Sequence, residues 1–119
     1  MYLIKVDSKN GKTIASNRLS TAKTDMNIHI FESCKLVLID DLIGMIITRT
    51  ATTHTDGLNH QGAIAVVLSA ETLEVVKNLG QTSGHSMGHS LIKRSDKVFA
   101  GIDLGDNYPR GINYWTFNA

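Results

Sequence analysis

The 119-residue chain is predicted to be an all-β protein. Short apolar runs end at Gly, Asn, Asp or Ser, which is typical of strands joined by turns. No segment keeps the apolar period of a helix. The pair Asn10-Gly11 gives the strongest hairpin signal, because both residues tolerate the positive φ that a tight turn needs. With 42% hydrophobic and 19% charged residues, the composition predicts one globular domain spanning residues 1–119.

Each predicted strand follows from its own run of residues. Tyr2–Asp7 and Thr13–Ser20 flank the Asn10-Gly11 turn, and a polar loop is expected at residues 56–62. Alternation in the last strand puts Trp115 on the core-facing side, whereas the threonines at 48, 50 and 52 suggest a solvated strand face. The remaining strands are predicted at residues 27–33, 35–40, 43–55, 63–69, 73–79, 90–95, 97–104 and 111–117.

An internal repeat is visible in the order of these strands. The offset between matched residues drifts from 61 to 63, which divides the chain into repeats of approximately 2–62 and 63–119. The matched residues are Val6 with Val67, Ser8 with Ser69, Ile14 with Val75, Ser33 with Ser95, Lys35 with Lys97, Val37 with Phe99, and Ile39-Asp40 with Ile102-Asp103.

A tandem unit of four antiparallel strands resembles a blade of a β-propeller. The period is longer than the roughly 40 to 50 residues of WD40 or kelch repeats, and neither motif occurs here. The resemblance implies about two blades, whereas a closed propeller needs about four or more. Further chain or oligomerisation would then complete the ring, because open strand edges invite association. A β-sandwich of eight or nine strands is the alternative, since it needs no partner.

Charge and targeting features exclude several classes of partner. The net charge is +1 and the basic residues are scattered, so nucleic acid is not expected. The first residues do not form a signal peptide, and no apolar run is long enough to span a membrane, so a soluble protein is expected, with its compartment left open. A single cysteine, Cys34, excludes an intrachain disulfide, and it is expected to be a half-buried strand thiol rather than a nucleophile.

Two loop-rich stretches carry the residues that could bind a metal. "THTDGLNH" places His54, Asp56 and His60 close together, and imidazole with carboxylate suits Zn²⁺. The alternative is a turn whose histidines face solvent. "GHSMGH" lacks the glutamate of a zincin helix, so His85 is expected to stabilise a turn or contact a ligand.

"DLGDNYPRG" supplies a second kind of donor. Asp103, Asp106 and Asn107 carry oxygens of the type that Ca²⁺ prefers, although the spacing is not that of an EF-hand. In the structural alternative the same residues form a turn, Pro109 fixes φ, and Arg110 pairs with an aspartate.

The leading functional hypothesis is a non-enzymatic β-propeller-type binding and assembly module that recognises a protein or a glycan through its rim loops. It is expected to be a homo-oligomer or part of a longer chain. The alternative is a metal-dependent enzyme in which His54, His60 and His85 bind Zn²⁺ or another ion and Asp56 or Asp103 acts as the base. The expected ligand-binding residues are His54, Asp56, His60, His85, Asp106, Asn107 and Arg110.

Overall fold

A computed structural model describes residues 2–19, 30–53, 59–81, 86–105 and 111–119. Side chains are described for 2–19, 34–48, 62–79, 87–88, 90–105 and 111–119. No helix that is long and apolar enough to cross a membrane occurs among the described residues. The strands are β1 (Tyr2–Val6), β2 (Thr13–Arg18), β3 (Ile30–Ile39), β4 (Leu42–Thr53), β5 (Asn59–Ser69), β6 (Val75–Gln81), β7 (Ser86–Ser95), β8 (Val98–Gly105) and β9 (Gly111–Asn118).

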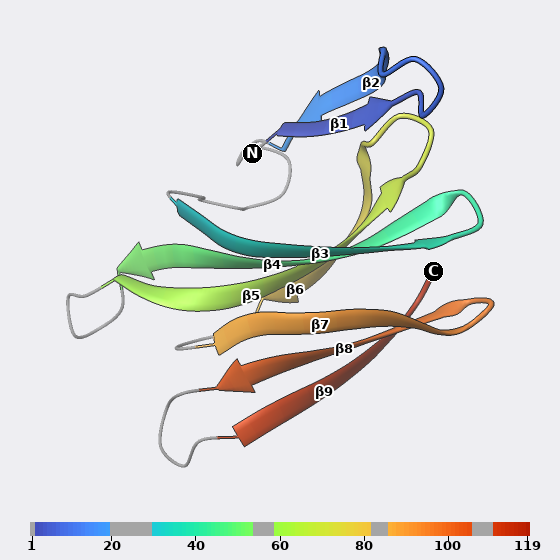
Figure 1. Ribbon diagram of the computed structural model, residues 1–119. Coiled ribbons are helices and arrows are strands. Elements are labelled where there is room, and N and C mark those ends of the chain that lie inside the picture. Colours follow the sequence, from blue (N-terminus) through green and yellow to red (C-terminus); the bar gives the residue numbers. More distant parts are fainter. Residues whose placement is uncertain (1, 20–29, 54–58, 82–85, 106–110) are drawn as a thin grey trace.

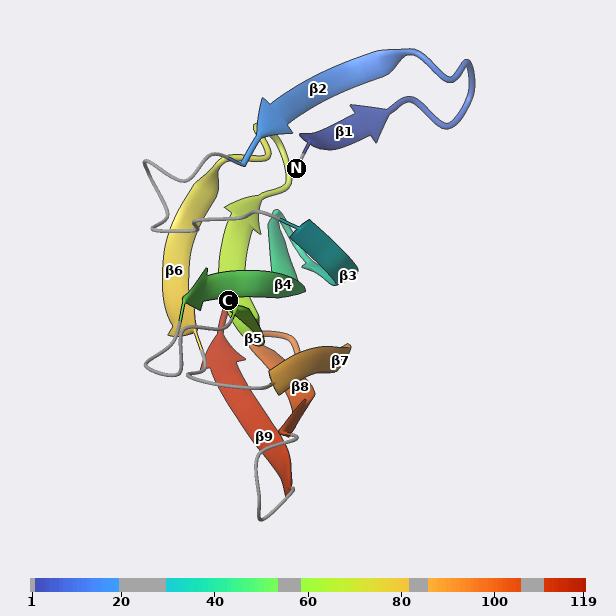
Figure 2. The same ribbon diagram turned by 90° about the vertical axis from the view of Figure 1, so that its left-hand side faces the viewer.

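The strands form three antiparallel sheets. Sheet A has the order β1-β2, sheet B the order β3-β4-β5-β6, and sheet C the order β7-β8-β9. The sheets are stacked in the order of the chain, with sheet B between the other two (Figures 1 and 2). The all-β class is therefore confirmed. No sheet closes on itself within the described residues, and three layers are present rather than the two of a sandwich.

Several strand boundaries differ from those predicted, three of them by more than a residue or two. The two short strands expected on either side of Cys34 are one strand, β3, which pairs with β4 from Ile30 opposite Thr50 to Ile39 opposite Leu42. This pairing runs through the position of the expected turn, so the chain stays extended there. Residues 59–62 belong to β5 rather than to a loop, and residues 86–89 begin β7.

The central strands of sheet B, β4 and β5, are buried on both faces, which explains their continuous apolar runs. The face toward sheet A forms a first core, and the face toward sheet C a second. Trp115 and Phe117 of β9 pack on the second core, as the alternation predicted. The buried members of the first core are Leu19, Met45, Ile47, Ile64, Val66 and Leu68, and those of the second are Ile39, Ile46, Ala65, Val67, Leu91 and Phe99.

The solvated face expected for the threonines of β4 is wrong at Thr48, which is fully buried. Its hydroxyl donates a hydrogen bond of 3.3 Å to the carbonyl oxygen of Gly88 in sheet C. Alternating threonines give the same sequence pattern on a wet face as on a buried face whose hydroxyls find partners. The pattern alone therefore could not separate the two.

The β1–β2 and β5–β6 hairpins have the same turn. The Gly11 N–H donates to the Asp7 carbonyl at 2.8 Å, and the Leu73 N–H donates to the Ser69 carbonyl at 2.9 Å. Gly11 has a φ of 70° and Leu73 a φ of 63°, so both turns use the left-handed region. Each hairpin also has a bulge one residue before its turn, at Lys5/Val6 and at Val67/Leu68.

The turn hydrogen bonds align the two hairpins at an offset of 62 residues. In this alignment Asp7 is equivalent to Ser69, and Gly11 is equivalent to Leu73. The sequence comparison, which matched Ser8 with Ser69, was one residue out of register. The match of β3 residues 33–37 with residues 95–99 is wrong, because 95–99 comprise the end of β7, a turn and the start of β8. A one-residue slip exchanges the two faces of a strand, so the register decides which side chains of the two hairpins are equivalent.

Candidate functional site

The residues that the sequence singled out for binding fall largely outside the described part of the chain. Residues 54–58, 82–85 and 106–110 are not described, which leaves out His54, Asp56, His85, Asp106, Asn107 and Arg110. His60 lies in β5, but its side chain is not described either. Among the described residues, no group of three or more His, Cys, Asp or Glu side chains could hold a metal.

Asp103, named as a candidate base, is fully buried on β8. It lies opposite Gly88 of β7 and Asn113 of β9, on the side of sheet C that faces sheet B. The Asn113 side-chain amide donates a 2.6 Å hydrogen bond to one carboxylate oxygen, Oδ1. The other oxygen, Oδ2, has no hydrogen-bond partner among the described residues. A buried carboxylate with an unpaired oxygen is costly, so this position is the strongest polar candidate in the described core.

Replacing Asp103 tests whether its carboxylate is paired. Asp103→Asn keeps an acceptor for Asn113 and removes a buried charge, so we expect the free energy of unfolding to rise by about 1 kcal/mol or more. Asn113→Ala leaves both carboxylate oxygens of Asp103 without a hydrogen-bond donor, so the free energy of unfolding should fall by about 1–3 kcal/mol. Urea denaturation of the two variants measures both changes. A loss of stability in Asp103→Asn would contradict the prediction.

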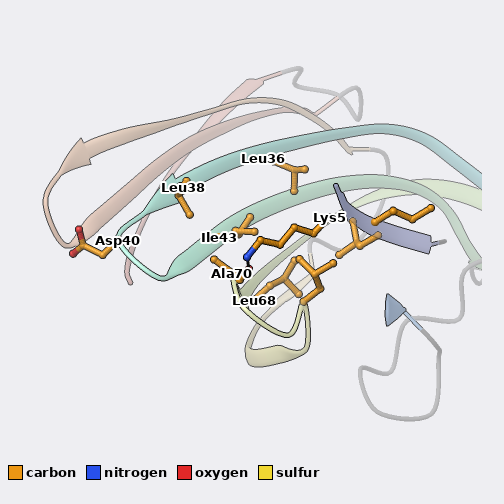
Figure 3. A pocket seen from close by; sticks show the side chains of 10 residues that line it. Lys5, Leu36, Leu38, Asp40, Ile43, Leu68 and Ala70 are labelled. Atoms are coloured by element: carbon orange, nitrogen blue, oxygen red, sulfur yellow. Dashed lines mark hydrogen bonds between the residues drawn. The ribbon is translucent and has the colours of Figure 1, made fainter. Parts of the chain in front are cut away.

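A groove lies between sheet A and the edge of sheet B, with a volume of about 550 Å³ (Figure 3). Lys5 extends across it, and its ammonium donates a 2.9 Å hydrogen bond to the carbonyl oxygen of Ala70. Apart from Lys5 and Asp40 the walls are apolar. The lining residues are Leu3, Ile4, Lys5, Leu36, Leu38, Asp40, Ile43, Leu68, Ala70 and Leu73.

The groove exists because sheet A is narrower than sheet B. Sheet A has two strands and sheet B four, and the first core places sheet A over β4, β5 and β6 rather than over β3. Leu36 and Leu38 of β3 are therefore 53% and 60% exposed. Sequence reasoning missed this site. The signal was the unbroken apolar run from Leu36 to Ile39, which indicates a strand covered on both faces.

Cys34 lies on β3, opposite Ile47 and on the same face as Leu36. The residue is exposed in accessible surface, although neighbouring atoms lie close enough to desolvate the thiol in part, as a half-buried position would. Desolvation of the thiol raises its pKa above the ordinary value of 9.0, and the neighbouring Lys35 ammonium opposes this by lowering the pKa. A raised pKa leaves little thiolate at neutral pH, which argues against a nucleophilic role.

The reactivity of Cys34 follows from this shift. We expect iodoacetamide to alkylate the folded protein more slowly than the urea-unfolded chain at about pH 8, because the folded state holds less thiolate. The pH at which alkylation reaches half of its maximal rate should be higher for the folded protein than for the unfolded chain. Mass spectrometry of quenched samples measures both rates. Equal midpoints would contradict the prediction.

Comparisons with protein families, curated proteins and solved structures returned no match to this chain.

Proposed function

We propose that the protein is a non-enzymatic binding and assembly module built like a segment of a β-propeller. Its end sheets pack on sheets of further copies, and its loops recognise a protein or a glycan. The proposal rests mainly on one observation: the outer faces of both end sheets are apolar and exposed. The exposed side chains are Tyr2, Ile4, Val6 and Ile14 on sheet A, and Met87, Ile92, Leu104, Ile112 and Tyr114 on sheet C.

The hairpin equivalence supports a continuing stack. At the offset of 62, Ile4 and Val6 of sheet A correspond to Val66 and Leu68 of sheet B. In sheet B these positions are fully buried under sheet A, whereas Ile4 is 61% exposed. Positions that form a core in one copy of a repeat favour a buried role in the other. The outer face of sheet A therefore has the residues of an interior face.

Sheet C offers a comparable surface at the other end of the stack. Ile92, Ile102 and Tyr114 surround a depression of about 170 Å³ on its outer face. Contiguous exposed apolar surface on a soluble domain commonly marks an interaction site. Because the two outer faces differ, their contact would be head-to-tail, which produces rings or filaments.

The loop part of the proposal rests on the sequence, because residues 54–58, 82–85 and 106–110 are not described. In this part His54, Asp56, His60, His85, Asp106, Asn107 and Arg110 remain the expected ligand contacts.

The solution mass tests the assembly. We expect oligomers at micromolar concentration in sedimentation or light scattering, and at least about tenfold weaker association in Ile92→Asp, since an apolar contact would be replaced by a charge. Val76→Asp is the matched control, because Val76 on β6 is similarly exposed, at 57% against 56% for Ile92. A wild-type protein that stays monomeric would overturn the assembly.

The unpaired oxygen of Asp103 favours a second candidate function, the metal-dependent enzyme. In it His54, His60 and His85 hold the ion and Asp103 or Asp56 is the base. Elemental analysis of the purified protein tests this, with zinc and calcium both measured. Less than about a tenth of an equivalent of metal, and no thermal stabilisation on adding either ion, would exclude it.

A further inference from the structure

We propose that the groove beside β1 is the docking site for a β-hairpin of another polypeptide, which would add two strands to sheet A. The inference rests on the proposed binding function and names its partner as a protein rather than a glycan. The hairpin's second strand would pair with the free edge of β1, and its inward side chains would cover Leu36 and Leu38.

The contact between sheets B and C shows what the groove lacks. Leu36 is paired across the strands with Met45, in the fourth residue pair counted from the β3–β4 turn. Leu91 is paired in the same way with Gly101, in the fourth residue pair counted from the β7–β8 turn. The two leucines thus hold equivalent positions. Leu91 is 7% exposed, because β7 packs against β3, β4 and β5 of sheet B. Leu36 is 53% exposed, because sheet A has no strand in the corresponding place within the described residues.

Among the residues that the structure describes, no strand pairs with the edge of β1 that forms one wall of the groove, and an open edge of this kind selects for a polypeptide. Within the described residues β1 pairs with β2 alone. In an antiparallel ladder, alternate residues direct their N–H and C=O groups away from the partner strand, so the other edge of β1 can accept a further strand. A strand added there places backbone hydrogen bonds along the edge and alternate side chains in the groove. Neither a sugar nor a lipid supplies that ladder of donors and acceptors.

The register of sheet B predicts how the added strand is placed. β1 corresponds to β5, whose second partner is β4, with Ile46 opposite Ala65 and Gly44 opposite Val67. At the offset of 62, these positions of β5 become Leu3 and Lys5. The added strand therefore needs an apolar residue opposite Leu3 and a small residue opposite Lys5, whose side chain crosses the groove.

The number of strands argues against a second copy of this chain in the groove. Sheet A is two strands short of sheet B, whereas sheet C has three strands. β9 is the third strand of sheet C, and β5 is the third strand of sheet B. Because β1 is equivalent to β5, β9 and β1 hold the same position in their sheets. Sheet C of a second copy could not enter the vacant place without displacing β1, but a two-stranded hairpin could.

A synthetic peptide of residues 33–50 provides the probe, with Cys34→Ser to prevent oxidation and lysines added for solubility. It contains the β3–β4 turn and most of both strands. Hydrogen exchange of the intact protein is measured with and without the peptide. We expect at least about tenfold slower exchange at those alternate residues of 3–5 whose N–H groups point away from β2, since these amides would enter a ladder. A peptide N-methylated at alternate positions on the pairing edge should give no protection.

Two variants and one control connect the protection to the groove. Leu36→Asp and Leu38→Asp, both at exposed positions, should weaken peptide binding at least about tenfold, because each replaces an apolar wall with a charge. Val76→Asp, at a similarly exposed position outside the groove lining, should change it less than about twofold. Using two separate variants guards against a folding defect in either.

The outcomes separate this inference from the assembly proposal. Peptide binding that leaves residues 3–5 unprotected, or equal binding of the N-methylated peptide, would overturn the hairpin site. Protection that grows with protein concentration in the absence of peptide would place a second copy in the groove and overturn it too. Neither result depends on Ile92, whose substitution tests the outer face of sheet C.

Discussion

Phe99→Ala should lower the free energy of unfolding by about 3–5 kcal/mol, the range for removing a fully buried aromatic ring. Phe99 is 0% exposed at the centre of the contact between sheets B and C. Its ring lies over the bare backbone of Gly44, where an added Cβ would come within 2.6 Å of the ring. The Phe117 ring is tilted against it at a centroid distance of 5.2 Å. Because a glycine has no side chain to move into the vacated space, the cavity beside Gly44 would stay open.

Urea denaturation followed by the fluorescence of Trp115, the single tryptophan, measures this loss. Ile92→Ala on the outer face of the same sheet is the control, and should cost less than about 1 kcal/mol in the monomer. If Phe99→Ala does not fold, Phe99→Leu still tests the site, since it should cost an intermediate amount. A loss below about 1 kcal/mol in Phe99→Ala would contradict the packing of sheets B and C.

The all-β class could be predicted because it depends on local pattern. The Asn10-Gly11 turn, the two-residue turns at 40–41 and 96–97, and the apolar alternation of β9 each report on their own few residues. The division around Cys34 failed because Glu32 and Ser33 resemble a break in sequence. Pairing with residues 42–50 of β4 continues through this place with only a bulge between Phe31 and Ser33, and so overrides the local preference, as tertiary context often does for strands.

The sheet packing and the groove could not be predicted, because they depend on which strand faces which. A run such as Leu36 to Ile39 indicates burial on both faces but does not say whether a partner is present. Thr48 carries no sequence signal for its bond to Gly88. Asp103 was identified as an oxygen donor from its type, but its burial and its bond from Asn113 depend on strands brought together from β8 and β9. The likeness of the β1–β2 and β5–β6 turns is visible only in their hydrogen bonds, because the two turn sequences share no motif.

The second large loss of stability is expected where Ile46 contacts Gly88. A Cβ added at Gly88 would overlap the Cγ2 of Ile46, and its next neighbour, the Thr48 hydroxyl, is 3.5 Å away. We expect Gly88→Ala to cost about 1–3 kcal/mol, because the core between sheets B and C has no room for a methyl group. Gly111→Ala is the matched control in the same sheet, since a Cβ there meets nothing within 4 Å. It should change stability by less than about 0.5 kcal/mol.

A double-mutant cycle distinguishes this steric cause from a general weakness of β7. Ile46→Ala alone should cost about 2–5 kcal/mol, because Ile46 is fully buried and its removal leaves a cavity. The same substitution removes the Cγ2 that the methyl group introduced by Gly88→Ala would strike, so the double variant should lose about 1–3 kcal/mol less than the sum of the single variants. Additive losses would mean that Gly88 is sensitive for a reason other than Ile46. A favourable coupling would establish in solution that sheet B packs on sheet C at this close approach, in addition to the one between Phe99 and Gly44.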